Sequence, residues 1–187
     1  MNLRRAFPLL ILLAGIPRAA SCQQWTHEDW RDLRHRLEYN LDLQGLFASR
    51  PFWRLKLDDR KEMVKQIACG LGMAPSLALA LIEQESGFDQ GARGQFGELG
   101  AAQVLPATAR QHQLDQQRLA TEFRYNVAGG LTILKSLLAQ FPERAAVQAY
   151  NGGPAFASSA QQVQEKVRRY AAEVLARKEK YDGVQCN

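Results

Sequence analysis

The chain has 187 residues and a formal net charge of +5, and 46% of its residues are hydrophobic. This length suits one well-filled core and leaves little room for a second domain. The share of charged residues, 23%, is ordinary for a globular protein, so the composition excludes wholesale disorder. A basic balance suggests an anionic partner such as nucleic acid only if the positive charges cluster in the working part of the chain.

The first 21 residues have the layout of a secretory signal peptide. Arg4 and Arg5 precede an apolar run over residues 6–16, and small residues follow at 19–21. The run is shorter than the roughly 17–25 residues that a bilayer-spanning helix needs. We therefore expect export and cleavage. An uncleaved anchor or a buried N-terminal helix is the alternative.

The signal segment also carries most of the excess positive charge. It holds three arginines and no acid, so its removal lowers the formal charge by three, from +5 to +2. No later stretch combines a run of Lys and Arg with interleaved aromatic residues. We therefore expect no nucleic-acid partner, and only a mild attraction to an anionic wall, screened at physiological salt.

Three cysteines bear on anchoring and on redox state. Residues 19–22, Ala-Ala-Ser-Cys, resemble a bacterial lipobox, which makes Cys22 a lipidation candidate, but they also suit ordinary cleavage after Ser21. If Cys22 is lipidated, Cys69 and Cys186 remain as a pair that an oxidising compartment can bridge. If it is not, Cys22–Cys186 is equally plausible, and Cys69 can be a small buried hydrophobe. Neither the Cys nor the His spacing resembles a metal site, and we expect no metal or other cofactor.

The pattern of apolar residues predicts a mainly helical mature chain with weak strand signals throughout. A charged helix over residues 27–46 ends at the break formed by residues 49–51. The further helices are expected from Asp58 or Asp59 to about Cys69, over residues 75–86, near 106–113 and 124–140, and over 143–151 and 159–180. The Gly-rich residues 88–105 are irregular and can hold a small sheet or a loop.

The helix expected over residues 75–86 carries a carboxylate on its apolar face. Four residues share that face at i, i+3, i+4 and i+7: Ala78, Leu81, Ile82 and Glu85. Glu83 lies about 200° further round and is expected in solvent. An ionised carboxylate beside apolar surface is costly, so the pKa of Glu85 should rise until the group can donate a proton near neutral pH. The alternative is a Glu that caps the helix or forms a salt bridge at its end.

Later residues can surround Glu85. Glycines at 94, 97 and 100 allow the backbone to fold back towards it. Gln103 supplies a neutral donor and acceptor suited to a sugar hydroxyl or an acetamido group. Residues 149–154, Ala-Tyr-Asn-Gly-Gly-Pro, end a later helix with a sharp stop.

Together these segments resemble the soluble lytic transglycosylase family, relatives of goose-type lysozyme. The first match is ESGFDQGARGQFGELGAAQ at residues 85–103, against the family pattern E-S-x-F-x-P-x-A-x-S-x-x-G-A-x-G-L-M-Q. The second comprises Asn126-Val127 with Gly130 and Leu134, and the third is AYNGGP at 149–154. A looser match covers residues 165–174, with Tyr170 one place out of step.

The first motif departs from the family pattern at several positions. Gln90 stands in place of Pro, Gly94 in place of Ser, and Glu98 in place of Ala. Ala101 and Ala102 replace Leu-Met. Because the family's Met usually lines the sugar groove, Ala102 implies a roomier or weaker subsite. None of these departures removes the acid.

The resemblance implies a mainly α, lysozyme-like (α+β) fold and cleavage of the β-1,4 bond between N-acetylmuramic acid and N-acetylglucosamine, with 1,6-anhydro ends. It makes Glu85 the catalytic residue. The expected substrate-binding residues are Ser86, Gln103, Tyr150, Asn151 and Tyr170. The residues expected to hold the fold are Phe88, Gly97, Gly100, Asn126, Gly130 and Gly152. A lysozyme-type hydrolase and a catalytically silent peptidoglycan-binding accessory are the alternatives.

The resemblance covers roughly residues 62–181, most of the mature chain. We expect a signal peptide over 1–21, an N-terminal helical segment over 22–58, the transglycosylase domain over 59–182 and a tail over 183–187. The expected partner is the peptidoglycan glycan strand, acted on by a monomer in the bacterial periplasm or cell envelope. A lipid anchor at Cys22 and service to an envelope secretion or conjugation machine stay open.

Overall fold

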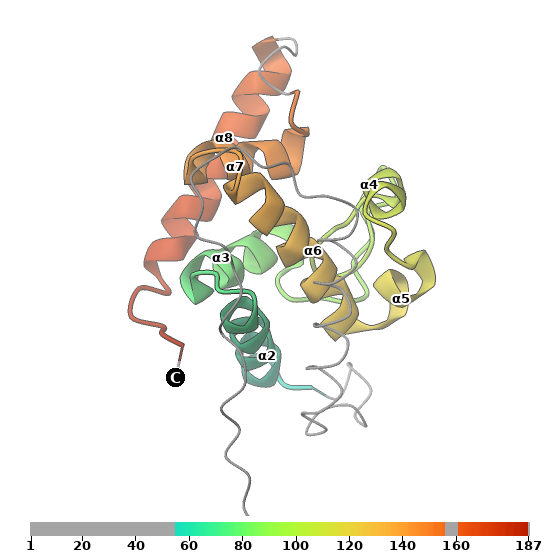
Figure 1. The fold of residues 1–187 in the computed structure, drawn as a ribbon, viewed down its shortest axis with the longest axis vertical. Helices are drawn as coiled ribbons and strands as arrows, with labels where there is room; N and C mark the ends of the chain where they lie inside the picture. Colours follow the sequence, from blue (N-terminus) through green and yellow to red (C-terminus); the bar gives the residue numbers. More distant parts are fainter. Residues whose placement is uncertain (1–54, 156–160, 187) are drawn as a thin grey trace, which may run out of the picture.

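The computed structural model describes residues 55–155 and 161–186, which are coloured in Figure 1. The expected signal peptide, the charged helix over 27–46 and Cys22 lie outside the described residues. Within the described ranges no helix is both long and apolar enough to cross a bilayer.

The described chain is built from helices, which confirms the mainly helical fold. In chain order they are α2 (Leu57–Gly70), α3 (Pro75–Ser86), α4 (Pro106–Gln111), α5 (Gln116–Thr121), α6 (Phe123–Leu138), α7 (Glu143–Gly152) and α8 (Gln161–Glu179). Helix α5 was not among the helices expected from the sequence. Asp115 caps this helix, since its side chain accepts a hydrogen bond of 2.8 Å from the backbone N–H of Arg118.

Helix α3 occupies the centre of the core. Pro75 begins it, because proline's missing N–H costs nothing in the first turn. Residues 77–82 are all buried. The helix packs against α2 and α8, and Figure 1 shows the three helices together. Gly87 ends it with a left-handed φ of 62°, which glycine adopts without strain. Helix α3 is therefore held in position by packing against two other helices.

The Gly-rich residues after α3 form a loop. Only two isolated antiparallel bridges occur among the described residues, between Arg93 and Leu99 and between Leu99 and Val104. Phe88 begins the loop with its ring buried and a positive φ of 67°. Gly100 is needed near the end of the loop, because a Cβ there would overlap the amide of Asn126 and lie 2.8 Å from the carbonyl oxygen of Leu119.

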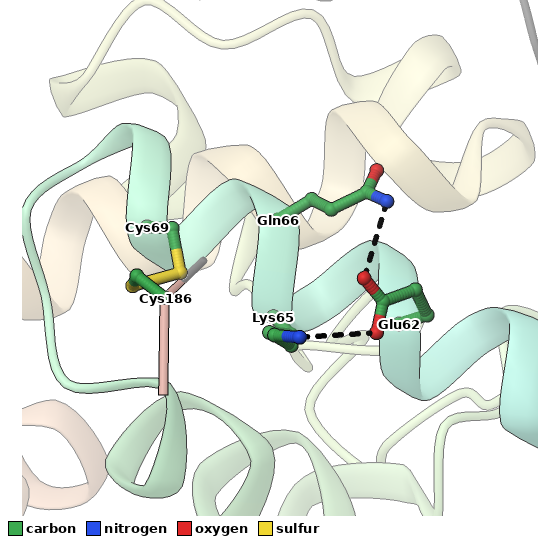
Figure 2. Close-up of a disulfide and its surroundings, with 5 residues drawn as sticks. All are labelled: Glu62, Lys65, Gln66, Cys69 and Cys186. Atoms are coloured by element: carbon green, nitrogen blue, oxygen red, sulfur yellow. Dashed lines mark hydrogen bonds and ion pairs between the residues drawn. A yellow bond between two sulfur atoms is a disulfide. The ribbon is translucent and has the colours of Figure 1, made fainter. Parts of the chain in front are cut away.

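A disulfide joins Cys69 at the end of α2 to Cys186 near the C-terminus (Figure 2). The two residues are 117 positions apart in the sequence. The sequence left the pairing of the three cysteines open, and the structure shows the bridge between Cys69 and Cys186. It closes the C-terminal segment onto the helix that supports α3, and it suits a chain that folds in an oxidising compartment.

Loss of this bridge is expected to destabilise the domain. The double variant Cys69→Ser/Cys186→Ser should lose about 2–5 kcal/mol of unfolding free energy. Without the cross-link, the unfolded chain regains the conformational entropy that closing this long loop removes. Urea denaturation under oxidising conditions measures the change. Cys22→Ser is the control and should keep the wild-type midpoint. If Cys22→Ser also lowers the midpoint, the pairing is different.

Candidate active site

Glu85 lies in the last turn of α3, where the apolar face of the helix meets the Gly-rich loop. Its neighbours on that face, Ala78, Leu81 and Ile82, are fully buried, while Glu85 itself remains partly exposed. Burial raises the pKa of Glu85 from an ordinary 4.5 to about 7, a hydrogen bond from Tyr170 opposes the rise, and the charge of Glu98 adds to it. A carboxyl group in this state can donate a proton near neutral pH and then take one back.

Two tyrosines from later helices approach Glu85. The hydroxyl of Tyr170, on α8, donates a hydrogen bond to Oε1 of Glu85. The hydroxyl of Tyr150, on α7, donates to the carbonyl oxygen of Ala102 at 2.8 Å. Burial, and then the negative charge of Glu85, raises the pKa of both tyrosines well above the usual value. Both phenols therefore stay protonated and act as donors.

Gly130 permits the close approach of Tyr150 to the loop. A Cβ at this position would overlap the Cβ of Ala102 and lie 2.9 Å from the hydroxyl oxygen of Tyr150. Ala102 is fully buried in this contact. Its side chain is thus not exposed to an open groove, and a roomier or weaker sugar subsite stays a prediction.

Asn126 fixes the loop to α6 with three hydrogen bonds. Its amide donates to the carbonyl oxygens of Leu99 at 2.7 Å and Leu119 at 2.9 Å, and its Oδ1 accepts from the N–H of Ala102 at 2.7 Å. The side chain is fully buried. Since the three bonds join backbone groups of the loop and of α5 to one buried side chain on α6, Asn126 helps to hold the loop in place.

Ser86 and Gln103 also form hydrogen bonds with the loop. The hydroxyl of Ser86 donates to the carbonyl oxygen of Ala101 at 2.7 Å and accepts from the N–H of Asp89 at 3.0 Å. The amide of Gln103 donates to the carbonyl oxygen of Gly100 at 2.7 Å, and the backbone of Gln103 has a positive φ of 49°. Both side chains are partly exposed. These bonds stabilise the loop next to the acid.

The remaining expected residues lie around this centre. Asn151 is exposed in the last turn of α7, directly after Tyr150, and Gly152 ends that helix. Gly97 has a φ of 83° at the tip of the loop and faces Pro106. The structure thus brings Glu85 together with Tyr170 and the loop, while Asn151 lies at the surface.

Two residues that contribute to this region appeared in the sequence only as departures from the family pattern. Gln90 is buried and bridges the loop, because its amide donates to the carbonyl oxygen of Leu119 at 2.7 Å and its Oε1 accepts from the N–H of Ala101 at 3.4 Å. Glu98 adds a second negative charge near Glu85. A carboxylate inside a Gly-rich segment was the signal that could have pointed to Glu98.

Glu83 differs from its expectation as well. It is not simply solvated, since its carboxylate accepts a hydrogen bond of 3.1 Å from Tyr181 and lies 3.5 Å from the ammonium group of Lys180. Its contacts are thus with the C-terminal segment and away from Glu85. Among the residues that the structure describes, no group of three or more His, Cys, Asp or Glu could hold a metal ion.

The hydrogen bond from Tyr170 leads to a prediction about pH. Because this bond favours the ionised carboxylate, Tyr170→Phe should raise the pKa of Glu85 further, by up to about one unit. The alkaline limb of kcat/KM for glycan cleavage should move to higher pH by the same amount. Tyr181→Phe is the matched control, since its hydroxyl bonds to Glu83. An alkaline limb that stays in place or moves down in Tyr170→Phe would contradict the geometry.

Glu85 is a carboxyl group with a raised pKa at the end of a helix, and it lies beside two phenols and a Gly-rich loop. This arrangement defines an acid–base site on a helical fold.

Residues 62–172 match the family described as "Transglycosylase SLT domain". The match covers more than half of the chain, so the chain belongs to the transglycosylase SLT domain family.

Solved structures show the same fold. One is the X-ray structure of an inactive variant of the lytic transglycosylase Slt from Pseudomonas aeruginosa, with a TM-score of 0.53 and 22% identity over 83% of this chain. Another is the crystal structure of the 70 kDa soluble lytic transglycosylase from Escherichia coli, with a TM-score of 0.55 and 21% identity over 81% of this chain. The alignments cover 31% and 29% of those two chains, so this chain spans about a third of their length.

Proposed function

We propose that the chain is a peptidoglycan lytic transglycosylase, which cleaves the β-1,4 bond between N-acetylmuramic acid and N-acetylglucosamine and leaves 1,6-anhydro ends. The observation that carries the proposal is Glu85, a partly exposed acid whose pKa of about 7 suits proton transfer in both directions near neutral pH. Family membership supplies the substrate class.

In the proposed reaction Glu85 serves as acid and then as base. Its proton goes to the oxygen of the leaving N-acetylglucosamine as the bond from C1 of the muramic acid breaks. The resulting carboxylate then takes the proton of the muramic acid's own 6-hydroxyl, and that oxygen bonds to C1. The proton that Glu85 gave is thereby regained, and no water is consumed. The substrate's acetamido group takes the place of the second carboxylate that many glycosidases use.

The surrounding residues have supporting roles in this scheme. Tyr170 orients the carboxyl group of Glu85 through its hydrogen bond. Ser86 and Gln103 hold the loop beside the acid, and the partly exposed Gln103 has an amide suited to an acetamido group. Tyr150 and the exposed Asn151 follow each other at the end of α7, where sugar substituents would contact them.

We also infer the setting of the enzyme. The signal-like residues 1–21 lead to export, residues 22–58 precede the catalytic domain at 59–182, and residues 183–187 form the tail. The disulfide supports an oxidising compartment such as the periplasm. A monomer acting on glycan strands, with Cys22 as a candidate lipid anchor, fits these features. Intact mass of the mature protein tests the cleavage site and the anchor.

Analysis of the muropeptides tests the reaction itself. Purified sacculi are digested with the mature protein, and the soluble products are analysed by mass spectrometry. The proposal predicts 1,6-anhydro ends. Reducing ends instead would identify a lysozyme-type hydrolase, and binding to sacculi without soluble products would identify a silent accessory domain.

A further inference from the structure

Among the residues that the structure describes, Phe96 has the most exposed large hydrophobic side chain. Its exposed fraction is 70%, against 44% for Leu57 and 37% for Leu105. The family pattern leaves position 96 unspecified, so membership of the family does not account for an aromatic ring there. Single exposed hydrophobic residues are ordinary in proteins, but Phe96 is set apart by the way the backbone holds it.

Phe96 lies in the middle of a closed turn, residues 94–98, which we call the hairpin tip. The N–H of Gly94 donates to the carbonyl oxygen of Glu98 at 3.2 Å, and the N–H of Gly97 donates to the carbonyl oxygen of Gly94 at 3.1 Å. Gly97 has a φ of 83°, a conformation that glycine adopts without strain. The backbone on both sides of Phe96 is therefore tied together.

The side chain of Glu98 stabilises the hairpin tip further. Its Oε2 accepts a hydrogen bond of 2.9 Å from the N–H of Phe96. The same side chain lies against Gly94, where an added Cβ would overlap the carboxylate and lie 2.9 Å from the Cβ of Glu98. A Cβ added at Gly97 would lie 3.9 Å from Cγ of Pro106, so the tip also lies close to the start of α4. The backbone of Phe96 is thus held in place while its ring stays in water.

The hairpin tip belongs to the same loop that contacts the end of α3. The carbonyl oxygen of Ala101 accepts a hydrogen bond of 2.7 Å from Ser86, the neighbour of Glu85. Phe96 precedes Ala101 by five positions, and each residue spans at most about 3.6 Å, so the two Cα atoms lie no more than about 18 Å apart. A glycan strand several sugars long that is bound at Glu85 can therefore extend to the tip.

The charge near the ring favours a sugar over a peptide stem as its ligand. The carboxylate of Glu98 is partly exposed and is bonded to the backbone of Phe96 itself. Stem peptides of peptidoglycan carry carboxylates, which this negative charge repels. An N-acetylglucosamine residue is uncharged, and the C–H groups on the face of its ring form an apolar surface that suits a flat aromatic side chain.

We propose that Phe96 is a further substrate-binding residue, whose ring packs against the face of an N-acetylglucosamine residue in a glycan strand that extends beyond the acid–base site. The inference rests on the proposed function, because it names a second contact with the same substrate. Phe96 transfers no proton. Its contact strengthens the binding of long strands and leaves the chemistry at Glu85 unchanged.

The test measures binding of long glycan strands from which the stem peptides have been removed. Calorimetric titration uses the mature protein with Glu85→Gln, so that the strands stay intact. Adding Phe96→Ala should lower the affinity roughly fivefold to tenfold. Phe96→Leu, which is apolar but not flat, should lose nearly as much, whereas Phe96→Trp should keep the affinity. Leu57→Ala is the matched control, since Leu57 is exposed at the start of α2, and it should bind normally.

Kinetics of the otherwise wild-type protein give a second readout. Phe96→Ala should raise KM for long strands by a similar factor, with kcat and the melting temperature unchanged, because the ring is exposed. A fall in kcat at constant KM would overturn the inference, since the substitution would then have disturbed the acid.

Two binding results would also overturn the inference. One is unchanged affinity of Phe96→Ala for stem-free strands. The other is a loss of affinity confined to strands that keep their stems, which would assign the ring to the peptide. Because binding is measured without turnover, it decides the role of Phe96 whichever chain ends the wild-type protein produces, and the muropeptide analysis tests the proposed function separately.

Discussion

Glu85→Gln is expected to abolish most glycan cleavage and, at the same time, to make the protein more stable at alkaline pH. Gln has the shape of Glu but cannot transfer a proton, so kcat should fall roughly a hundredfold to ten-thousandfold. The release of soluble products from sacculi measures this loss. Glu83→Gln is the matched control on the same helix and should keep wild-type activity.

The stability gain follows from the raised pKa of Glu85. In the folded protein this pKa is about 7, against an ordinary 4.5 in the unfolded chain. The folded state therefore holds the proton more tightly, and wild type loses stability as the pH rises from below 4.5 through 7. Gln does not titrate, so the variant should match wild type at about pH 4 and exceed it by about 1–3 kcal/mol at about pH 8, discounted for partial exposure.

Thermal unfolding of both proteins across this pH range measures the difference. A melting temperature of Glu85→Gln that rises above wild type only at higher pH would support the buried acid. Equal melting temperatures at every pH would show that the carboxyl group is solvated in the folded protein. Retention of full activity would show that another group supplies the proton.

Asn126→Ala is expected to be the most destabilising single substitution near the site. It removes three hydrogen bonds of 2.7, 2.9 and 2.7 Å from a fully buried side chain. The N–H of Ala102 and the carbonyl oxygens of Leu99 and Leu119 would lose this partner. The free energy of unfolding should fall by about 3–4 kcal/mol, as measured by urea denaturation.

Gln140→Ala provides the matched control for Asn126→Ala. Its amide also donates to a backbone carbonyl oxygen, that of Ser136 at 3.0 Å, but Gln140 is exposed in a surface turn. The expected loss is at most about 0.5 kcal/mol. If the two variants unfold at the same urea concentration, the loop does not depend on Asn126.

Local signals accounted for much of the fold. Pro75 and Gly87 predicted both ends of α3, because each residue type has a conformational preference that suits its end of a helix. The spacing of apolar residues in the same helix predicted that Glu85 points inward, and the three fully buried neighbours on its face confirm that orientation. Helical periodicity depends only on nearby residues, so a single sequence reveals it.

Contacts between segments far apart in the sequence could not be predicted from these local patterns. Tyr170 meets Glu85 across 85 positions, and Cys69 meets Cys186 across 117. Neither contact follows from local periodicity, because each depends on how α8 and the C-terminal segment pack against α2 and α3. The side chain of Glu98 lies against Gly94, close by in the sequence, but this contact depends on the conformation of the turn between them. Helix α5 was missed although Asp115 carried a capping signal.

The most direct test of the account is digestion of purified sacculi in water enriched in a heavy oxygen isotope. The mature wild-type protein and Glu85→Gln are compared by mass spectrometry of the released muropeptides. We predict that wild type yields 1,6-anhydro ends without any heavy oxygen, since the attacking group is the sugar's own hydroxyl, and that Glu85→Gln yields almost no product. Heavy oxygen in the new chain ends, or undiminished release by Glu85→Gln, would contradict the account.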